Sequence, residues 1–140
     1  MLIAEDDPHD VTPLLRAFKK RPAWKIAVVD DGMEALDYLF KRGKYTDVWR
    51  PDLFILNLNM PKVDGLDVLK QVRAVPYLAT IPIVIWTVSQ HFMDIERAYG
   101  LGAAAFVSKP CGDDEMQQCA IAIRTFWDKV RFLDTEEPVA

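Results

Sequence analysis

Short apolar runs alternate with longer amphipathic stretches along this chain, and that alternation limits the fold more than any other feature of the sequence. Five runs of four to six residues are apolar at mostly consecutive positions rather than at every second position. Strands that are buried on both faces of a parallel sheet have this pattern. The runs cover residues 1–4, 26–29, 53–58, 83–87 and 104–107.

The stretches between these runs have the spacing of helices. Apolar residues recur there every three or four positions, which places them on one face of an amphipathic helix. The five stripes are Val11, Leu14 or Leu15, and Phe18; Met33, Leu36, Tyr38 and Leu39; Leu66, Val68, Leu69 and Val72; Phe92, Ile95, Ala98 and Tyr99; and Met116, Ala120, Ile123 and Trp127.

Local signals mark two of the helix starts. Asp7 before Pro8 is typical of an N-cap followed by proline at the first helical position. Asp114 with Gln117 predicts a capping box at the last helix. Pro13 lies inside the first stripe, where it removes one backbone hydrogen bond, so we expect that helix to kink or to start late.

Strands that alternate with helices predict an α/β fold, because right-handed crossovers place helices on both faces of a parallel sheet. We therefore expect a doubly wound, five-stranded parallel sheet with five helices. A chain of 140 residues suits one domain. We assign residues 1–133 to that domain and residues 134–140 to a flexible C-terminal tail.

The composition narrows the functional classes. Hydrophobic residues make up 51% and charged residues 27%, which is typical of a globular domain and argues against disorder. The net charge of −4 offers no general attraction to nucleic acid, and no apolar stretch is long enough to span a membrane. No basic leader is visible, and Cys111 and Cys119 lack the spacing of a metal site. We expect a cytoplasmic domain with reduced thiols.

Polar side chains follow four of the five predicted strands. Glu5 and Asp6 follow the first, Asn57 lies at the end of the third, Thr87 ends the fourth and Lys109 follows the fifth. In parallel sheets, ligands bind beyond the carboxyl ends of the strands, where the strand order reverses. All five side chains are therefore expected at one edge of the sheet, in one site.

Taken together, four segments resemble the receiver domain of two-component response regulators over essentially the whole chain. They are IAEDD at 3–7, the segment 51–65 around Asn57, IPIVIWT at 81–87 and FVSKP at 106–110. The chain further resembles the small regulators that are paired with cyanobacterial and bacterial phytochromes. That likeness rests on residues 43–45 leading to 50–52, on Ser89 and on 126–127.

The resemblance implies a flavodoxin-like receiver fold and a phosphoryl-accepting site with a divalent metal. A receiver takes a phosphoryl group from a kinase histidine onto an aspartate, and Mg²⁺ neutralises the oxygens. Glu5 and Asp6 match the acidic pair that coordinates the metal. Asn59 matches the position whose backbone carbonyl is a ligand, and Asn57 stands at the phosphoacceptor position, which also contributes to the metal site.

The resemblance also assigns roles to three residues around the phosphoryl group. Lys109 would pair with the phosphoryl oxygens, and Thr87 would hydrogen-bond them and move on activation. Phe106 matches an aromatic switch position, and the Lys109–Pro110 bond is a candidate for a cis peptide. Each has a simpler interpretation: Lys109 as a solvated lysine, Thr87 as a strand end, and Phe106 as part of the core.

Asn57 departs from the family pattern, since a neutral amide replaces the nucleophilic aspartate. An amide oxygen is a far poorer nucleophile than a carboxylate, so we expect no acyl phosphate at residue 57. The metal site loses one of its three acidic groups, and we expect Mg²⁺ binding to be weak or absent. The predicted function is therefore protein–protein interaction without phosphorylation at that site.

Two origins of Asn57 are open at this point. The chain is either a naturally degenerate receiver or an Asp-to-Asn variant of a regulator that normally takes phosphate from a histidine kinase. Retention of the other site residues favours a site that was recently functional; they are Glu5, Asp6, Thr87 and Lys109. Trp86 is larger than the aliphatic residues usual there in the family, which favours natural divergence, the interpretation we adopt.

Two enzyme classes fit the sequence poorly. Flavin binding requires a phosphate loop rich in serine, threonine or glycine after the first strand, where the acidic residues 5–7 would repel a phosphate. A phosphohydrolase that forms an aspartyl phosphate needs the nucleophile that Asn57 does not supply. We therefore expect no enzymatic activity.

The resemblance implies a sensor histidine kinase of the phytochrome type as a partner. A single domain would pass on its signal through a surface, and the family uses its fourth helix, fifth strand and fifth helix. Phe126, Trp127 and Phe132 are too many apolar residues for one helix face, so we expect a homodimer through the C-terminal helix region. No nucleic acid or membrane partner is expected.

Overall fold

The computed structural model describes residues 1–20 and 24–133, in which strands and helices alternate along the chain. The predicted tail, residues 134–140, lies outside the described residues. The strands are β1 (Leu2–Ala4), β2 (Ala27–Val29), β3 (Phe54–Leu56), β4 (Ile83–Thr87) and β5 (Ala105–Ser108). The helices are α1 (Pro8–Lys19), α2 (Gly32–Leu39), α3 (Gly65–Arg73), α4 (Pro76–Ala79), α5 (Phe92–Gly100) and α6 (Asp113–Trp127), and a 3₁₀ turn covers Gly43–Tyr45.

The five strands form one sheet in the order β2-β1-β3-β4-β5. Each pairs in parallel with its neighbours, and β1 lies between β2 and β3. The expected doubly wound, five-stranded parallel sheet is therefore confirmed. The direction of winding reverses between β1 and β3, and the crevice at the carboxyl ends of these two strands is where such folds bind ligands.

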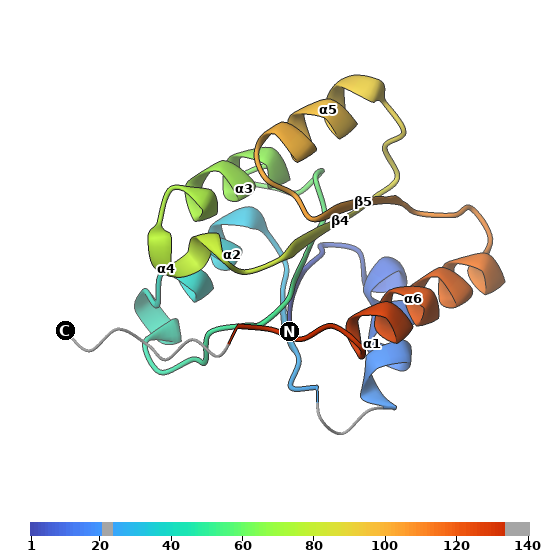
Figure 1. Ribbon diagram of the computed structural model, residues 1–140, viewed down its shortest axis with the longest axis horizontal. Helices are drawn as coiled ribbons and strands as arrows, with labels where there is room; N and C mark the ends of the chain where they lie inside the picture. Colours follow the sequence, from blue (N-terminus) through green and yellow to red (C-terminus); the bar gives the residue numbers. More distant parts are fainter. Residues whose placement is uncertain (21–23, 134–140) are drawn as a thin grey trace.

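Two apolar layers cover the sheet. On one face α1 and α6 lie side by side (Figure 1), and Phe18 of α1 packs there with Ile3 and Trp86 of the strands. On the other face α2, α3 and α5 cover residues such as Leu56. Both sides of each inner strand thus meet apolar side chains, which explains why the strand runs are apolar at consecutive positions.

Five of the helices match the predicted stripes, and α4 is an additional single turn. Its four residues are too few to show a helical period. The start of α1 is as predicted, because the Asp7 side chain accepts a hydrogen bond from the His9 N–H and Pro8 opens the helix. The helix continues through Pro13, so the expected late start is wrong.

The predicted capping box at the last helix is also wrong. α6 begins after Gly112, which offers no side chain to accept a capping hydrogen bond. Gln117 instead donates from Nε2 to the Pro13 carbonyl at 3.1 Å and so joins α6 to α1. Phe92 and Tyr99, which spacing placed on a buried stripe of α5, are largely exposed. Within the described parts of the chain, no helix could cross a membrane.

The loop from β3 to α3 carries Asn57 and Asn59 and lies directly against the start of α3. Gly65 donates its N–H to the Leu58 carbonyl at 2.8 Å. A Cβ added at residue 65 would lie 2.3 Å from the Asn57 carbonyl oxygen, which is closer than real Cβ atoms come. The absence of a side chain at Gly65 therefore allows α3 to hold this loop in place.

Replacing Gly65 by alanine should lower the free energy of unfolding by about 1–3 kcal/mol, the usual cost of forcing extra atoms into a packed site. Gly100→Ala is the matched control, because Gly100 is also helical but a Cβ there meets nothing within 4 Å. The control should change stability by less than about 1 kcal/mol. Urea unfolding followed by circular dichroism measures both, and equal midpoints would contradict the packing argument.

Candidate functional site

The carboxyl ends of β1, β3 and β5 bring the predicted polar residues to one edge of the sheet. Glu5 follows β1, Asn57 follows β3 and Lys109 follows β5. These three side chains are almost fully buried, whereas Asp6 is exposed. A buried polar group requires a partner inside the protein, so the hydrogen bonds of these residues define what the site can do.

The Asn57 amide is the centre of this group. Its Nδ2 lies 3.1 Å from Glu5 Oε1, 3.3 Å from Asp6 Oδ1 and 3.1 Å from the Asn59 carbonyl oxygen. Its Oδ1 accepts a longer hydrogen bond, 3.4 Å, from the Asn59 N–H. The opposite amide orientation would place Oδ1 against two carboxylates, so the surroundings favour the observed one. The four residues predicted to form a metal site are therefore together, with an amide nitrogen among their oxygens.

Lys109 is a buried cation and not a solvated lysine. Its Nζ lies 2.6 Å from Glu5 Oε2 and 2.8 Å from Asp10 Oδ2, and 2% of its side chain is exposed. Among the described contacts, none joins its ammonium to Asn57. The ammonium of Lys109 is therefore paired with the carboxylates of Glu5 and Asp10.

Asp10 is a site residue that the sequence reasoning missed. It lies in the first turn of α1, three residues after the N-cap Asp7, and its side chain is turned toward Lys109. The N-cap at Asp7 was recognised, and a helical projection from it could have placed Asp10 near the edge of the sheet. Acidic residues are so common in first turns that this position carried no separate signal.

Burial and ion pairing act in opposite directions on the two carboxyl groups that hold Lys109. Burial raises the pKa of Glu5, and the hydrogen bond from Lys109 offsets only part of that effect. Burial acts to raise the pKa of Asp10 as well, but hydrogen bonds from Lys109 and His9 outweigh it and hold the pKa below its usual value. Asp10 is thus the partner of Lys109 that is more firmly ionised.

Thr87 belongs to a separate set of hydrogen bonds. It ends β4 with its side chain buried, and its Oγ1 accepts from the Ser89 N–H at 3.3 Å. Ser89 in turn donates from Oγ to Asp94 Oδ2 at 2.6 Å, and Ser108 Oγ donates to the Ser89 carbonyl at 2.9 Å. The loop between β4 and α5 is therefore bonded to itself, to α5 and to the end of β5.

Phe106 is half-buried on the edge strand β5 and packs against the layer formed by α2, α3 and α5. Its N–H donates to the Tyr99 hydroxyl at 3.1 Å. The predicted cis peptide at Lys109–Pro110 is wrong, since none of the described peptide bonds is cis. The trans form is the ordinary one, because it is favoured by about 0.5–1 kcal/mol before proline.

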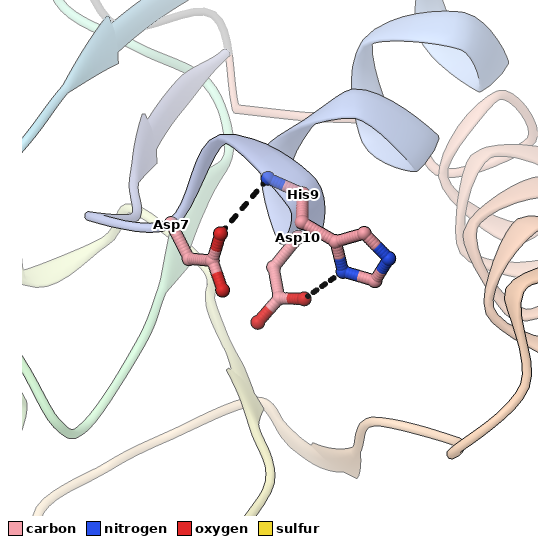
Figure 2. Close-up of side chains that lie close together, drawn as sticks. All are labelled: Asp7, His9 and Asp10. Atoms are coloured by element: carbon pink, nitrogen blue, oxygen red, sulfur yellow. Dashed lines mark hydrogen bonds and ion pairs between the residues drawn. The ribbon is translucent and has the colours of Figure 1, made fainter.

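Beside the buried group, Asp7, His9 and Asp10 lie together at the start of α1 (Figure 2). His9 Nδ1 pairs with Asp10 Oδ1 at 3.1 Å, and Nε2 lies 2.9 Å from Asp113 Oδ1 at the start of α6. These hydrogen bonds, first that to Asp10, raise the pKa of His9. His9 is a surface residue, and its contact with Asp113 joins α1 to α6.

Comparison with known proteins gives a consistent picture. Residues 1–121 match the response regulator receiver domain family. Response regulator Rcp1 of Synechocystis sp. (strain ATCC 27184 / PCC 6803 / Kazusa) is 29% identical over 128 residues, which cover 91% of this chain and 87% of Rcp1. The crystal structure of the phosphorylated cyanobacterial phytochrome response regulator RcpA is similar with a TM-score of 0.91 and 32% identity, over 96% of each chain. The crystal structure of Mn²⁺-bound Rcp1 also has a TM-score of 0.91, with 28% identity over 94% of this chain and 96% of that one.

Removing the ammonium of Lys109 tests how strongly the buried ion pair stabilises the fold. Lys109→Met should lower the free energy of unfolding by about 3–5 kcal/mol, because Glu5 is left as a buried charge without its cation. Glu5→Gln in the same background should restore part of the loss. Urea unfolding of the two single variants and the double variant measures the coupling. Strictly additive effects would mean that the two side chains do not stabilise each other.

Proposed function

The chain belongs to the response regulator receiver family of two-component signal transduction, and we propose that it acts there by protein–protein contacts, without taking a phosphoryl group on residue 57. The observation that carries the proposal is the hydrogen bonding of Asn57. Its amide nitrogen donates toward Glu5, Asp6 and the Asn59 carbonyl. Covalent phosphoryl transfer requires an activated nucleophile, and a neutral amide held as a donor is not one.

The remaining site residues support the same conclusion. The ammonium of Lys109 is bonded to Glu5 and Asp10, so it is already paired before any phosphoryl group arrives. The hydroxyl of Thr87 accepts from the Ser89 N–H in the loop. We propose that Lys109, Thr87 and the half-buried Phe106 occupy the family's phosphoryl-binding and switch positions but are used here to hold one conformation.

The metal part of the site is proposed to be weak for a simple electrostatic reason. Glu5, Asp6, Asn57 and the Asn59 carbonyl stand at the family's metal positions, but residue 57 brings no charge. Rcp1, a relative of this chain, has been crystallised in a Mn²⁺-bound form. We propose that Mg²⁺ binds this chain weakly or not at all.

The proposed upstream partner is a sensor histidine kinase of the phytochrome type. Two solved structures with TM-scores of 0.91 are of RcpA, a cyanobacterial phytochrome response regulator, and of Rcp1. The free thiols Cys111 and Cys119 fit a reducing compartment, which we propose is the cytoplasm. The proposed role is that of a binding module and not of an enzyme.

Intact mass spectrometry after incubation with a small-molecule phosphodonor and Mg²⁺ tests the central claim. The protein should gain no mass, whereas Asn57→Asp should gain one phosphoryl group that is lost on mild alkaline treatment. An adduct on the unaltered protein that disappears in Asn57→Ala would contradict the proposal.

A second candidate function is that of an Asp-to-Asn variant of a regulator that is normally phosphorylated by a histidine kinase. The specific observation in its favour is that Glu5 and Asp6 still contact Asn57 and that Lys109 is bonded to Glu5 beside them. The Asn57→Asp variant separates the two, since rapid phosphoryl transfer from a kinase to it would favour the variant origin. Phosphorylation of that variant by a small-molecule phosphodonor but not by the kinase would favour natural degeneracy.

We also propose a homodimer through the C-terminal helix region, based on the exposed Phe126 and the apolar groove beside it. Trp127 and Phe132 stack on each other within the chain, with ring centroids 6.0 Å apart, and Phe132 meets Trp24 edge-on. Of the three aromatic residues Phe126, Trp127 and Phe132, Phe126 is the largely exposed one, with 61% of its surface accessible to solvent. It borders an apolar groove of about 450 Å³ between the edge strand β5 and α6, lined also by Val84, Ala105, Val107, Ile123 and Trp127.

The dimer proposal predicts that a charge at Phe126 weakens self-association. Phe126→Asp should raise the dimer dissociation constant at least tenfold, about 1.4 kcal/mol, as expected for a central apolar anchor. Met33→Asp is the control, because Met33 is also an exposed apolar residue but lies on α2. Sedimentation equilibrium over the micromolar range measures both. A monomer at every concentration would contradict the proposal.

A further inference from the structure

The oxygens around Asn57 are of the kind that a hard divalent cation prefers. Two carboxylates, of Glu5 and Asp6, and the carbonyl of Asn59 converge from two different segments of the chain. Mg²⁺ and Mn²⁺ sites in proteins are built from such groups together with water. By donor chemistry alone, these residues would suit the metal that the family uses.

The space between those oxygens is nevertheless taken by the protein itself. All three lie within 3.3 Å of one atom, Asn57 Nδ2. Mg²⁺ binds oxygen at about 2.0–2.1 Å, so an ion held by the same three oxygens on the side that faces Asn57 would lie closer to this N–H donor than van der Waals contact allows. An N–H donor and a cation cannot lie so close together, and the residues present therefore do not fit a bound metal.

We propose that the Asn57 amide nitrogen replaces the divalent cation in this pocket, so that the site is closed to metal by its own side chain. The inference rests on the proposed function, in that it treats residue 57 as the altered phosphoacceptor position. It goes further, because it attributes the loss of metal to occupation of the site and not only to the missing charge.

The hydrogen bonds of the pocket are complete without an ion. The amide carries two N–H donors directed at three acceptors, and its partial positive charge faces the two carboxylates. Lys109 supplies the full positive charge, to Glu5 and Asp10. In the described part of the chain, no side-chain oxygen of Glu5 or Asn57 is among the buried atoms left without a hydrogen-bond partner, and Asp6 is open to solvent. Nothing in the pocket requires a cation.

A metal ion could enter only after the amide had turned away. Turning it by half a revolution would bring Oδ1 toward Glu5 and Asp6, so an ion would have to displace three donor contacts before gaining its own ligands. Gly65 holds the backbone at this residue close to α3, with the Asn57 carbonyl 2.3 Å from where a Cβ would lie. A backbone shift that moved the Asn57 side chain out of the pocket would therefore also disturb α3.

Two explanations of weak metal binding can be separated by one substitution. If only the missing charge matters, Asn57→Ala should bind Mn²⁺ no better than the unaltered protein, since alanine restores no charge and no ligand. If the amide occupies the site, Asn57→Ala should bind Mn²⁺ more tightly, because it removes the obstruction and frees the three oxygens. The two explanations therefore predict different outcomes.

Isothermal titration with Mn²⁺, together with thermal unfolding with and without Mn²⁺, provides the measurement. The unaltered protein should show no shift of its unfolding temperature, and Asn57→Ala should bind at least tenfold more tightly and be stabilised by the ion. Asn57→Asp should bind tightest. Asp6→Asn in the Asn57→Ala background is the control and should lose the gain, which locates the ion at these oxygens.

Equal Mn²⁺ affinity of the unaltered protein and Asn57→Ala, or tighter binding by the unaltered protein, would overturn the inference. If Asn57→Ala does not fold, Asn57→Ser decides by the same comparison, since its shorter side chain also leaves the space open. A protein that binds Mn²⁺ tightly yet takes no phosphoryl group would refute this inference and leave the proposed function intact. Phosphoryl uptake by the unaltered protein would refute the proposed function.

Discussion

The ion pair between Glu5 and Lys109 is the interaction on which the polar edge of this molecule depends. Both side chains are buried and 104 residues apart in sequence, so the pair ties the end of β1 to the end of β5 across the sheet. A buried charge is tolerated only when it is paired and hydrogen-bonded. The buried charge of Glu5 therefore depends on Lys109. The other carboxylate oxygen of Glu5, Oε1, accepts hydrogen bonds from the Asn57 amide and from the Asp7 N–H.

Much of the fold could be predicted from the sequence because burial on both faces leaves a direct trace. Each of the five runs overlaps one strand of the structure: β1, β2 and β3 are shorter than their runs, β4 has the same bounds, and β5 is shifted by one residue to Ala105–Ser108. The predictions were wrong where a segment was too short to show a period, or where a sequence pattern fits more than one structure. The single turn α4 is too short to show a helical period, and the residues at the start of α6 match a capping pattern although Gln117 bonds to the Pro13 carbonyl instead. Trp127 and Phe132 were expected to be in excess of one helix face, but they stack on each other, and Phe132 also meets Trp24, a partner far along the chain.

The site was predictable in position but not in detail. The carboxyl ends of parallel strands meet at one edge, so the parallel direction of the strands was enough to predict that Glu5, Asn57 and Lys109 lie at the same edge. A long side chain such as that of Lys109 can reach several acceptors. Only the three-dimensional structure shows that it bonds to Asp10 as well as to Glu5. The contacts of Thr87 were likewise beyond reach, because they depend on the path of the loop after β4 and not on the identity of Thr87.

The self-bonded loop between β4 and α5 has a consequence for how information could pass through such a molecule. Ser89 is tied to Thr87, Asp94 and Ser108, while Val88 and Phe92 beside it project into solvent. These hydrogen bonds favour one conformation of the loop, and with it one exposed surface. The signalling output of a binding module with one conformation would be set by its concentration in the cell and by competition among proteins for the same face.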